Sequence, residues 1–166
     1  FGFNRVESIR SALVLIGDVR IRQWVSLAIM RTFGHQKPAE LMKQILVRAR
    51  FCELLSVQAG QAGRSADFFL MGLFSLMDAL MDSELPEILS HVYLSDEARS
   101  ALLDDEARSL FKCIFELARG YERSEWETVS RISEKLNIAS QAVMGSYVEA
   151  LQWATRSAGL WGGGGL

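Results

Sequence analysis

The stretch that decides the fold reads Asp67-Phe-Phe-Leu-Met-Gly-Leu-Phe-Ser-Leu-Met-Asp78. Between its two carboxylates the only polar side chain is that of Ser75. A run of about ten apolar residues is too short to cross a bilayer, which requires about twenty. It is long enough for a helix that is buried nearly all round in a helical domain. We expect Asp67 to cap this helix, and Asp82-Ser83, followed by Pro86, to mark its end.

Composition indicates a single globular, mostly helical domain. The chain has 166 residues, of which 49% are hydrophobic and 23% are charged, so it can form one substantial core. It contains only two prolines, and its commonest residues favour helix. No segment shows strict apolar–polar alternation. We therefore predict an all-α bundle of about seven to nine helices over residues 1–160, followed by a glycine-rich tail at residues 161–166.

The net charge and the cysteine content limit the kinds of binding partner and the cellular compartment that we expect. A net charge of −2 argues against nonspecific nucleic-acid binding, which requires a clustered basic face. Cys52 and Cys113 are too few for a disulfide framework, so we expect a cytoplasmic protein. We see no signal peptide and expect no membrane association. Because Phe1 stands where an initiator Met would, we expect the chain to be part of a longer protein.

Caps and apolar spacing place the individual helices. Two are expected before residue 38, over residues 8–16 and 18–33. A long helix from about Ala39 to Gln58 has an apolar arc that includes Arg48. Beyond Pro86 we expect shorter helices at residues 87–90, from 96 onward, and at 106–121, 125–136 and 140–157. Ser95 is expected to cap the second of these and Ser124 the fourth, which we expect to end at Asn137.

Residues of catalytic type have simpler structural explanations. Cys52 lies on an apolar helical stripe, where cysteine is more often a small core residue than a nucleophile. The acidic cluster at residues 104–106 is able to ligate a hard cation, but we favour a helix start there. Two segments contain glycines close together, Gly60-x-x-Gly63 and residues 162–165, and neither has the Lys-Ser/Thr pair of a phosphate loop. We therefore assign no catalytic residue, no metal and no cofactor.

The central stretch resembles a motif of the HD-type phosphohydrolases. In that family a helix reads approximately apolar-Leu-x-Gly-Leu-Leu-His-Asp-Ile-Gly, and its His-Asp pair binds the catalytic metal. The segment Leu70-Met-Gly-Leu-Phe74 fits the lead-in, but Ser75 and Leu76 occupy the His and Asp positions. This combination looks like an HDOD (HD-related output) domain. The sequence of residues 72–80 most resembles the branch of HDOD domains that follows EAL domains in bacterial cyclic di-GMP signalling proteins.

Four further stretches match the same pattern and, with the central helix, cover nearly the whole chain in the expected order. They lie at Ser11–Gly17, Arg48–Leu55, Tyr121–Glu127 and Tyr147–Ala154. Family members usually have several more helices before the first of these stretches, so the resemblance implies that the N-terminal lobe is absent here. It also implies that any cyclic di-GMP hydrolysis belongs to an EAL domain outside this chain.

The resemblance implies that the metal site has been lost. The only two histidines, His35 and His91, are each expected in a loop, and neither precedes an Asp. No histidine lies near Arg48, where the first family ligand would fall. Ser75 and Asp78 are three residues apart and would share a helix face. If the helices pack as in the HD family, Arg48 meets Asp78, and a polar network of Arg48, Ser75 and Asp78 replaces the metal. The alternative is that Arg48 extends to solvent.

We therefore expect a non-enzymatic regulatory or output domain of a bacterial cyclic di-GMP-related signalling protein. It would act by contact with an EAL domain of the same chain or with another signalling protein. The alternative is a sensor that binds a small ligand, such as a nucleotide, in the pocket left by the metal, with Arg48 as the anion contact. An open pocket lined by Arg48 and Ser75 would favour the sensor, and a closed ion pair would count against it. The sequence leaves the oligomeric state open.

Overall fold

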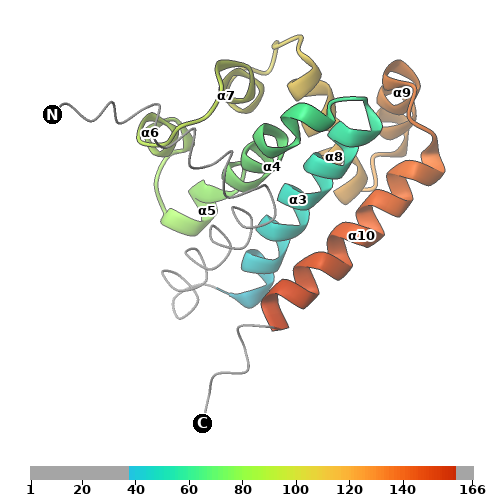
Figure 1. Cartoon of the computed structure of the whole chain (residues 1–166). Helices are drawn as coiled ribbons and strands as arrows, with labels where there is room; N and C mark the ends of the chain where they lie inside the picture. The colour runs from blue at the N-terminus through green and yellow to red at the C-terminus, as the bar shows by residue number, and fades with distance from the viewer. Residues whose placement is uncertain (1–37, 160–166) are drawn as a thin grey trace, which may run out of the picture.

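The computed structural model describes residues 38–159, and every regular element in that range is helical (Figure 1). The elements are α3 (Ala39–Gln58), the 3₁₀ turn η1 (Ala62–Arg64), α4 (Ser65–Phe74), α5 (Met77–Met81), α6 (Leu85–Ser90), α7 (Asp96–Leu103), α8 (Leu110–Glu122), α9 (Trp126–Leu136) and α10 (Ser140–Gly159). The predicted all-α class is confirmed. The helices expected before residue 38 and the tail at 161–166 lie outside the described residues.

Helix α3 runs through the middle of the bundle. It contacts α4 on one side and α10 on another, and α8 also packs against it (Figure 1). Eleven of its twenty residues are buried. Its bounds match the predicted Ala39 to Gln58, because Pro38 sets the start and the apolar arc is continuous to the end. None of the described helices is long and apolar enough to cross a membrane.

The stretch expected to form one helix forms two. Helix α4 already begins at Ser65, so Asp67 lies in its first turn rather than at the cap. The chain leaves the helix at Ser75, whose hydroxyl donates a 2.7 Å hydrogen bond to the Gly72 carbonyl oxygen. After Leu76, with φ −128° and ψ 15°, the short helix α5 starts in a new direction and ends at Asp82 in the left-handed conformation. A hydroxyl that bonds the preceding turn competes with the helix for its backbone groups.

The crossing of α3 and α4 depends on Gly72. A Cβ atom at this position would lie 2.7 Å from the carbonyl oxygen of Arg48 and 2.8 Å from Cα of Ala49. Both contacts are with backbone, which no side-chain rotation relieves. The glycine of the resemblance motif is therefore the residue that lets the two helices approach closely.

Two predicted helix starts in the second half are wrong. Asp104 is the C-terminal cap of α7, and the acidic cluster forms a turn in which its carboxylate accepts from the Glu106 amide at 2.9 Å. Helix α8 begins later, where Ser109 accepts a 3.1 Å hydrogen bond from the Lys112 amide. Ser124 does not cap α9. It has a φ of 60° and belongs to the tight turn that joins α8 to α9.

The predicted cap Ser95 is confirmed, since it accepts a hydrogen bond from the amide of Ala98 at 3.4 Å. The predicted stop at Asn137, which has a φ of 54°, is confirmed as well. Aromatic side chains fill the core between the helices. Phe68 of α4 stacks on Phe111 of α8, with ring centroids 3.9 Å apart. Together with the apolar side chains of α3, these rings form the core on which the polar site rests.

Candidate functional site

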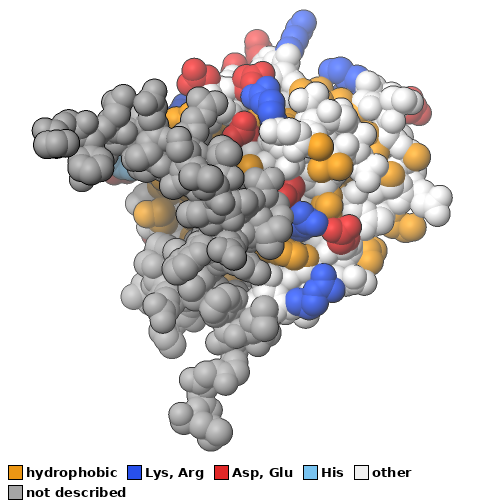
Figure 2. Space-filling model, in the orientation of Figure 1, with side chains coloured by type: hydrophobic (Ala, Val, Ile, Leu, Met, Phe, Trp, Pro, Cys, Tyr) orange, Lys and Arg blue, Asp and Glu red, His pale blue; other side chains and the backbone are white. Residues whose placement is uncertain are grey.

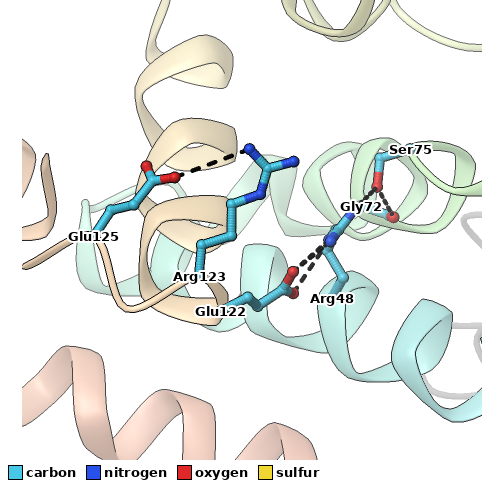
Figure 3. A network of polar contacts seen from close by, with 6 residues as sticks. All are labelled: Arg48, Gly72, Ser75, Glu122, Arg123 and Glu125. Atoms are coloured by element: carbon cyan, nitrogen blue, oxygen red, sulfur yellow. Dashed lines mark hydrogen bonds and ion pairs between the residues drawn. The ribbon is translucent and has the colours of Figure 1, made fainter. Parts of the chain in front are cut away.

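Arg48 lies within the core and forms an ion pair with Glu122, the last residue of α8 (Figure 3). Its Nε donates to the two carboxylate oxygens at 2.9 Å and 3.1 Å, and Nη2 donates to Oε2 as well. Each side chain is only 9% exposed. A buried guanidinium requires a paired, hydrogen-bonded anion, and the forked contact provides one.

Ser75 completes the contacts of the guanidinium. Nη1 of Arg48 donates to its hydroxyl oxygen at 3.3 Å, and that hydroxyl donates onward to the Gly72 carbonyl (Figure 3). The network thus joins α3, the end of α4 and the end of α8. All three attachment points are helix residues or helix ends, so the site depends on the mutual packing of these elements.

The structure brings together two of the three predicted network residues. Arg48 and Ser75 meet as expected, but Asp78 is exposed on α5. The expected Arg48–Asp78 contact is therefore wrong, and Glu122 takes that place. The reason is the break at residues 75–76, because the shared face of an i, i+3 pair exists only within one continuous helix. Whether the network has a function remains a prediction.

Glu122 was the residue missed from the sequence. It follows Ala118 by four residues and Ile114 by eight, so it continues the inward stripe of α8. A carboxylate at the end of an apolar stripe was the available signal. The sequence offers no indication, however, that this stripe ends beside Arg48, 74 residues earlier in the chain.

The Arg48–Glu122 pair lies among buried side chains, and burial raises the pKa values of two of its neighbours, Cys52 and Tyr147. Burial, reinforced by the negative charge of Glu122, raises the pKa of the Cys52 thiol to about 12. Burial raises the pKa of Tyr147 as well, with smaller contributions from Glu122 and Tyr121. Cys52 is therefore a neutral core thiol at physiological pH and not an activated nucleophile.

The contacts of Arg48 favour a structural role for this residue over a role in ligand binding. A hollow of about 320 Å³ lies between α3, α8 and α10, and Glu122 and Tyr147 contribute to its lining. Each of the three guanidinium nitrogens already donates to Glu122 or Ser75. Among the described residues, no group of three or more His, Cys, Asp or Glu side chains is placed to hold a metal ion. His91 is exposed, and His35 lies outside the described residues.

Two known proteins are similar to nearly the whole chain. YuxH of Bacillus subtilis (strain 168), an uncharacterized protein, is 32% identical over 153 residues, which are 90% of this chain and 36% of YuxH. The cyclic di-GMP phosphodiesterase CdgJ of Vibrio cholerae is 30% identical over 149 residues, which are 90% of this chain and 34% of CdgJ. The chain thus spans about a third of each relative. No family model and no solved structure matches it.

Proposed function

We propose that this chain is an HDOD-type regulatory domain of a bacterial, cytoplasmic signalling protein related to cyclic di-GMP, and that it acts without catalysis. The observation that carries the proposal is the similarity to CdgJ, a named cyclic di-GMP phosphodiesterase, over 90% of this chain but only a third of CdgJ. A unit that matches a third of such a protein is the size of one accessory domain. The ordered set of HDOD-like motifs in the sequence supports the same assignment.

Side-chain chemistry supports the non-catalytic part of the proposal. The two positions that carry His and Asp in HD phosphohydrolases hold a hydroxyl and an alkyl side chain, Ser75 and Leu76. The Ser75 hydroxyl is engaged by Arg48. Neither side chain supplies the imidazole or carboxylate that a divalent metal would require at this position.

The proposed mechanism is recognition of a protein partner, either an EAL domain of the same polypeptide or another signalling protein. Such a module transmits a signal only if the partner binds two of its conformations unequally. The Arg48–Ser75–Glu122 network is suited to the rigid part of this mechanism, because it holds three helices in one arrangement.

The first experiment separates catalysis from regulation. The purified chain is incubated with cyclic di-GMP, and separately with a phosphomonoester, in the presence of Mg²⁺ or Mn²⁺. We expect no turnover in either case, and metal-dependent hydrolysis would refute the non-catalytic role. The chain is then added in excess to intact CdgJ, where it should compete with the matching third and change the hydrolysis rate. An equal concentration of heat-unfolded chain is the control.

The alternative function is a nucleotide sensor, and the closed Arg48–Glu122 pair speaks against it. A ligand that binds only the folded state at a hundred times its Kd stabilises it by about 2.7 kcal/mol, equivalent to a Tm increase of roughly 5 to 10 °C. A thermal-shift screen against nucleotides and cyclic dinucleotides tests this directly. We expect no shift of that size, whereas a shift with one nucleotide would favour the sensor.

A further inference from the structure

Cys113 and Lys135 bring a thiol and a primary amine together between α8 and α9. Nζ of Lys135 donates to Sγ of Cys113 at 3.3 Å. Cys113 is half-buried, and Lys135 is exposed. On the face of the molecule that Figure 2 shows, acidic and basic side chains are interspersed, so charge marks no extended docking surface there. The contact of sulfur and nitrogen is a more specific feature, because an oxidised thiol condenses with a nearby nitrogen.

The amine of Lys135 has no competing partner within the part of the chain that the structure describes. No carboxylate there forms an ion pair with it, and its hydrogen bond goes to the Cys113 sulfur. Lys112 precedes Cys113 in the chain but is different. Its Nζ is buried and donates to the carbonyl oxygen of Asp104 at 2.8 Å and to that of Ala101 at 3.3 Å. Lys135 is therefore the amine that is available to Cys113.

An oxidant from solvent has a route to this sulfur. A hollow of about 360 Å³ lies at this point of the surface, and Cys113 and Lys135 both contribute to its lining. Cys52, the other cysteine, is fully buried in the core. Oxidation of a cysteine follows its exposure, so a small peroxide should reach Cys113 and not Cys52.

The pair lies where a covalent bond would close the α8–α9 hairpin. The two helices are joined at one end by the tight turn of residues 123–125. Cys113 is in the first turn of α8, and Lys135 is the residue before the last one of α9. The two side chains, 22 residues apart in the chain, therefore meet at the open end of the hairpin. A bond between them would complete a ring that contains both helices.

We propose that oxidation by a peroxide joins Cys113 and Lys135 through a sulfur–nitrogen bond and so locks the α8–α9 hairpin. In the first step the sulfur attacks hydrogen peroxide, the O–O bond breaks, and the thiol becomes a sulfenic acid while water is released. The Lys135 amine, after giving its extra proton to solvent, then attacks the sulfur. The S–O bond breaks, and the hydroxyl group leaves as water with one amine proton. One molecule of hydrogen peroxide is consumed, and the protein loses two hydrogen atoms.

Mass spectrometry of the full chain after brief treatment with hydrogen peroxide tests the proposal. The wild type should lose about 2 Da, whereas sulfenic or sulfinic acid alone would add about 16 or 32 Da. Trypsin cleaves after Lys and Arg, and a linked Lys135 should resist it. The peptide of residues 113–119 should therefore be recovered attached to residues 132–156, and dithiothreitol should separate the two. Because the link restricts the unfolded chain, Tm should rise on oxidation and fall again on reduction.

Lys135→Arg is the decisive variant, since it keeps the positive charge and removes the primary amine. It should stop at the oxidised thiol, with no linked peptides and no rise in Tm. Lys43→Arg on α3 is the matched control and should cross-link like the wild type. Oxidation of wild-type Cys113 without linked peptides would refute the proposal, as would a link to Lys112 or an unchanged product in Lys135→Arg. A link that leaves Tm unchanged would refute the lock. The proposed regulatory function does not depend on any of these results.

Discussion

At the scale of single residues, the ion pair of Arg48 and Glu122 joins α3 to the end of α8 inside the core. The pair itself adds little net stability, because the desolvation of two charges offsets most of their attraction. Removing one partner has a much larger effect, since it leaves the other charge buried without a counter-ion. We therefore expect the two side chains to specify one packing arrangement rather than to add net stability.

Glu122→Leu should destabilise the protein by about 3–5 kcal/mol, because it leaves the Arg48 guanidinium buried and unpaired. The double variant Arg48→Met/Glu122→Leu should recover most of that loss, since both charges are then gone. Urea unfolding of Glu122→Leu, Arg48→Met and the double variant measures the coupling free energy between the two side chains.

The exposed pair of Arg123 and Glu125 is the matched control for this cycle. Its closest nitrogen and oxygen atoms are 3.9 Å apart, and the side chains are 59% and 49% exposed (Figure 3). Glu125→Leu should change the free energy of unfolding by less than about 0.5 kcal/mol. Equal losses for Glu122→Leu and Glu125→Leu would contradict the account of the buried pair.

The Cys52 thiol should make stability depend on alkaline pH. Its pKa in the folded protein is about 12, against an ordinary value of 9.0. Between these two values the unfolded chain releases the proton and the folded chain retains it, so this contribution to stability is complete below pH 9 and declines as the pH rises towards 12. Cys52→Ala should reduce the alkaline decline by up to about 1.4 kcal/mol per pH unit.

Thiol labelling tests the same residue without unfolding the protein. Cys113 is half-buried and lies 3.3 Å from Nζ of Lys135, whereas Cys52 is fully buried. At pH 8 a thiol reagent should react with Cys113 first, and with Cys52 only at the rate of unfolding. Rapid reaction of both thiols in the native state would show that the Cys52 environment is open.

At the scale of elements, the same substitution, glycine to alanine, should change stability in opposite directions at Gly72 and Gly145. Gly72→Ala should destabilise the protein by about 1–3 kcal/mol, because the new methyl group overlaps the α3 backbone. Gly145→Ala should stabilise it by about 0.5–1 kcal/mol through helix propensity, since a Cβ atom there would meet nothing within 4 Å. Thermal unfolding of both variants gives the sign in each case.

The comparison of predicted and observed elements shows which signals are local. The bounds of α3 and the stop at Asn137 were predictable, since they depend on neighbouring residues and one backbone conformation. The break after Ser75 was not, because the stretch is apolar on both sides of Ser75 and the sequence does not show that its hydroxyl bonds back to Gly72 and accepts from Arg48. The apolar arc left two possibilities open for Arg48, burial in the core or extension to solvent, and its partner depends on which helices meet across 74 residues.

At the scale of the whole molecule, burial is distributed unevenly along the described chain. Helix α3 buries eleven residues and contacts α4, α8 and α10. The short helices α5 and α6 bury two residues each and lie at one side of the bundle (Figure 1). Elements with few buried contacts open at a lower free energy than the global unfolding, so the two regions should differ in local stability.

Native-state hydrogen exchange should therefore separate α5–α6 from the rest. We expect the amides of residues 77–90 to exchange through local opening, with little dependence on low denaturant concentrations, while the amides of α3 exchange only through global unfolding. This segment also contains Asp78, whose exposure follows from the same break in the chain. If it instead exchanged as slowly as α3, the α5–α6 segment would be part of the cooperative core, and a partner would have to unfold the whole domain to move it.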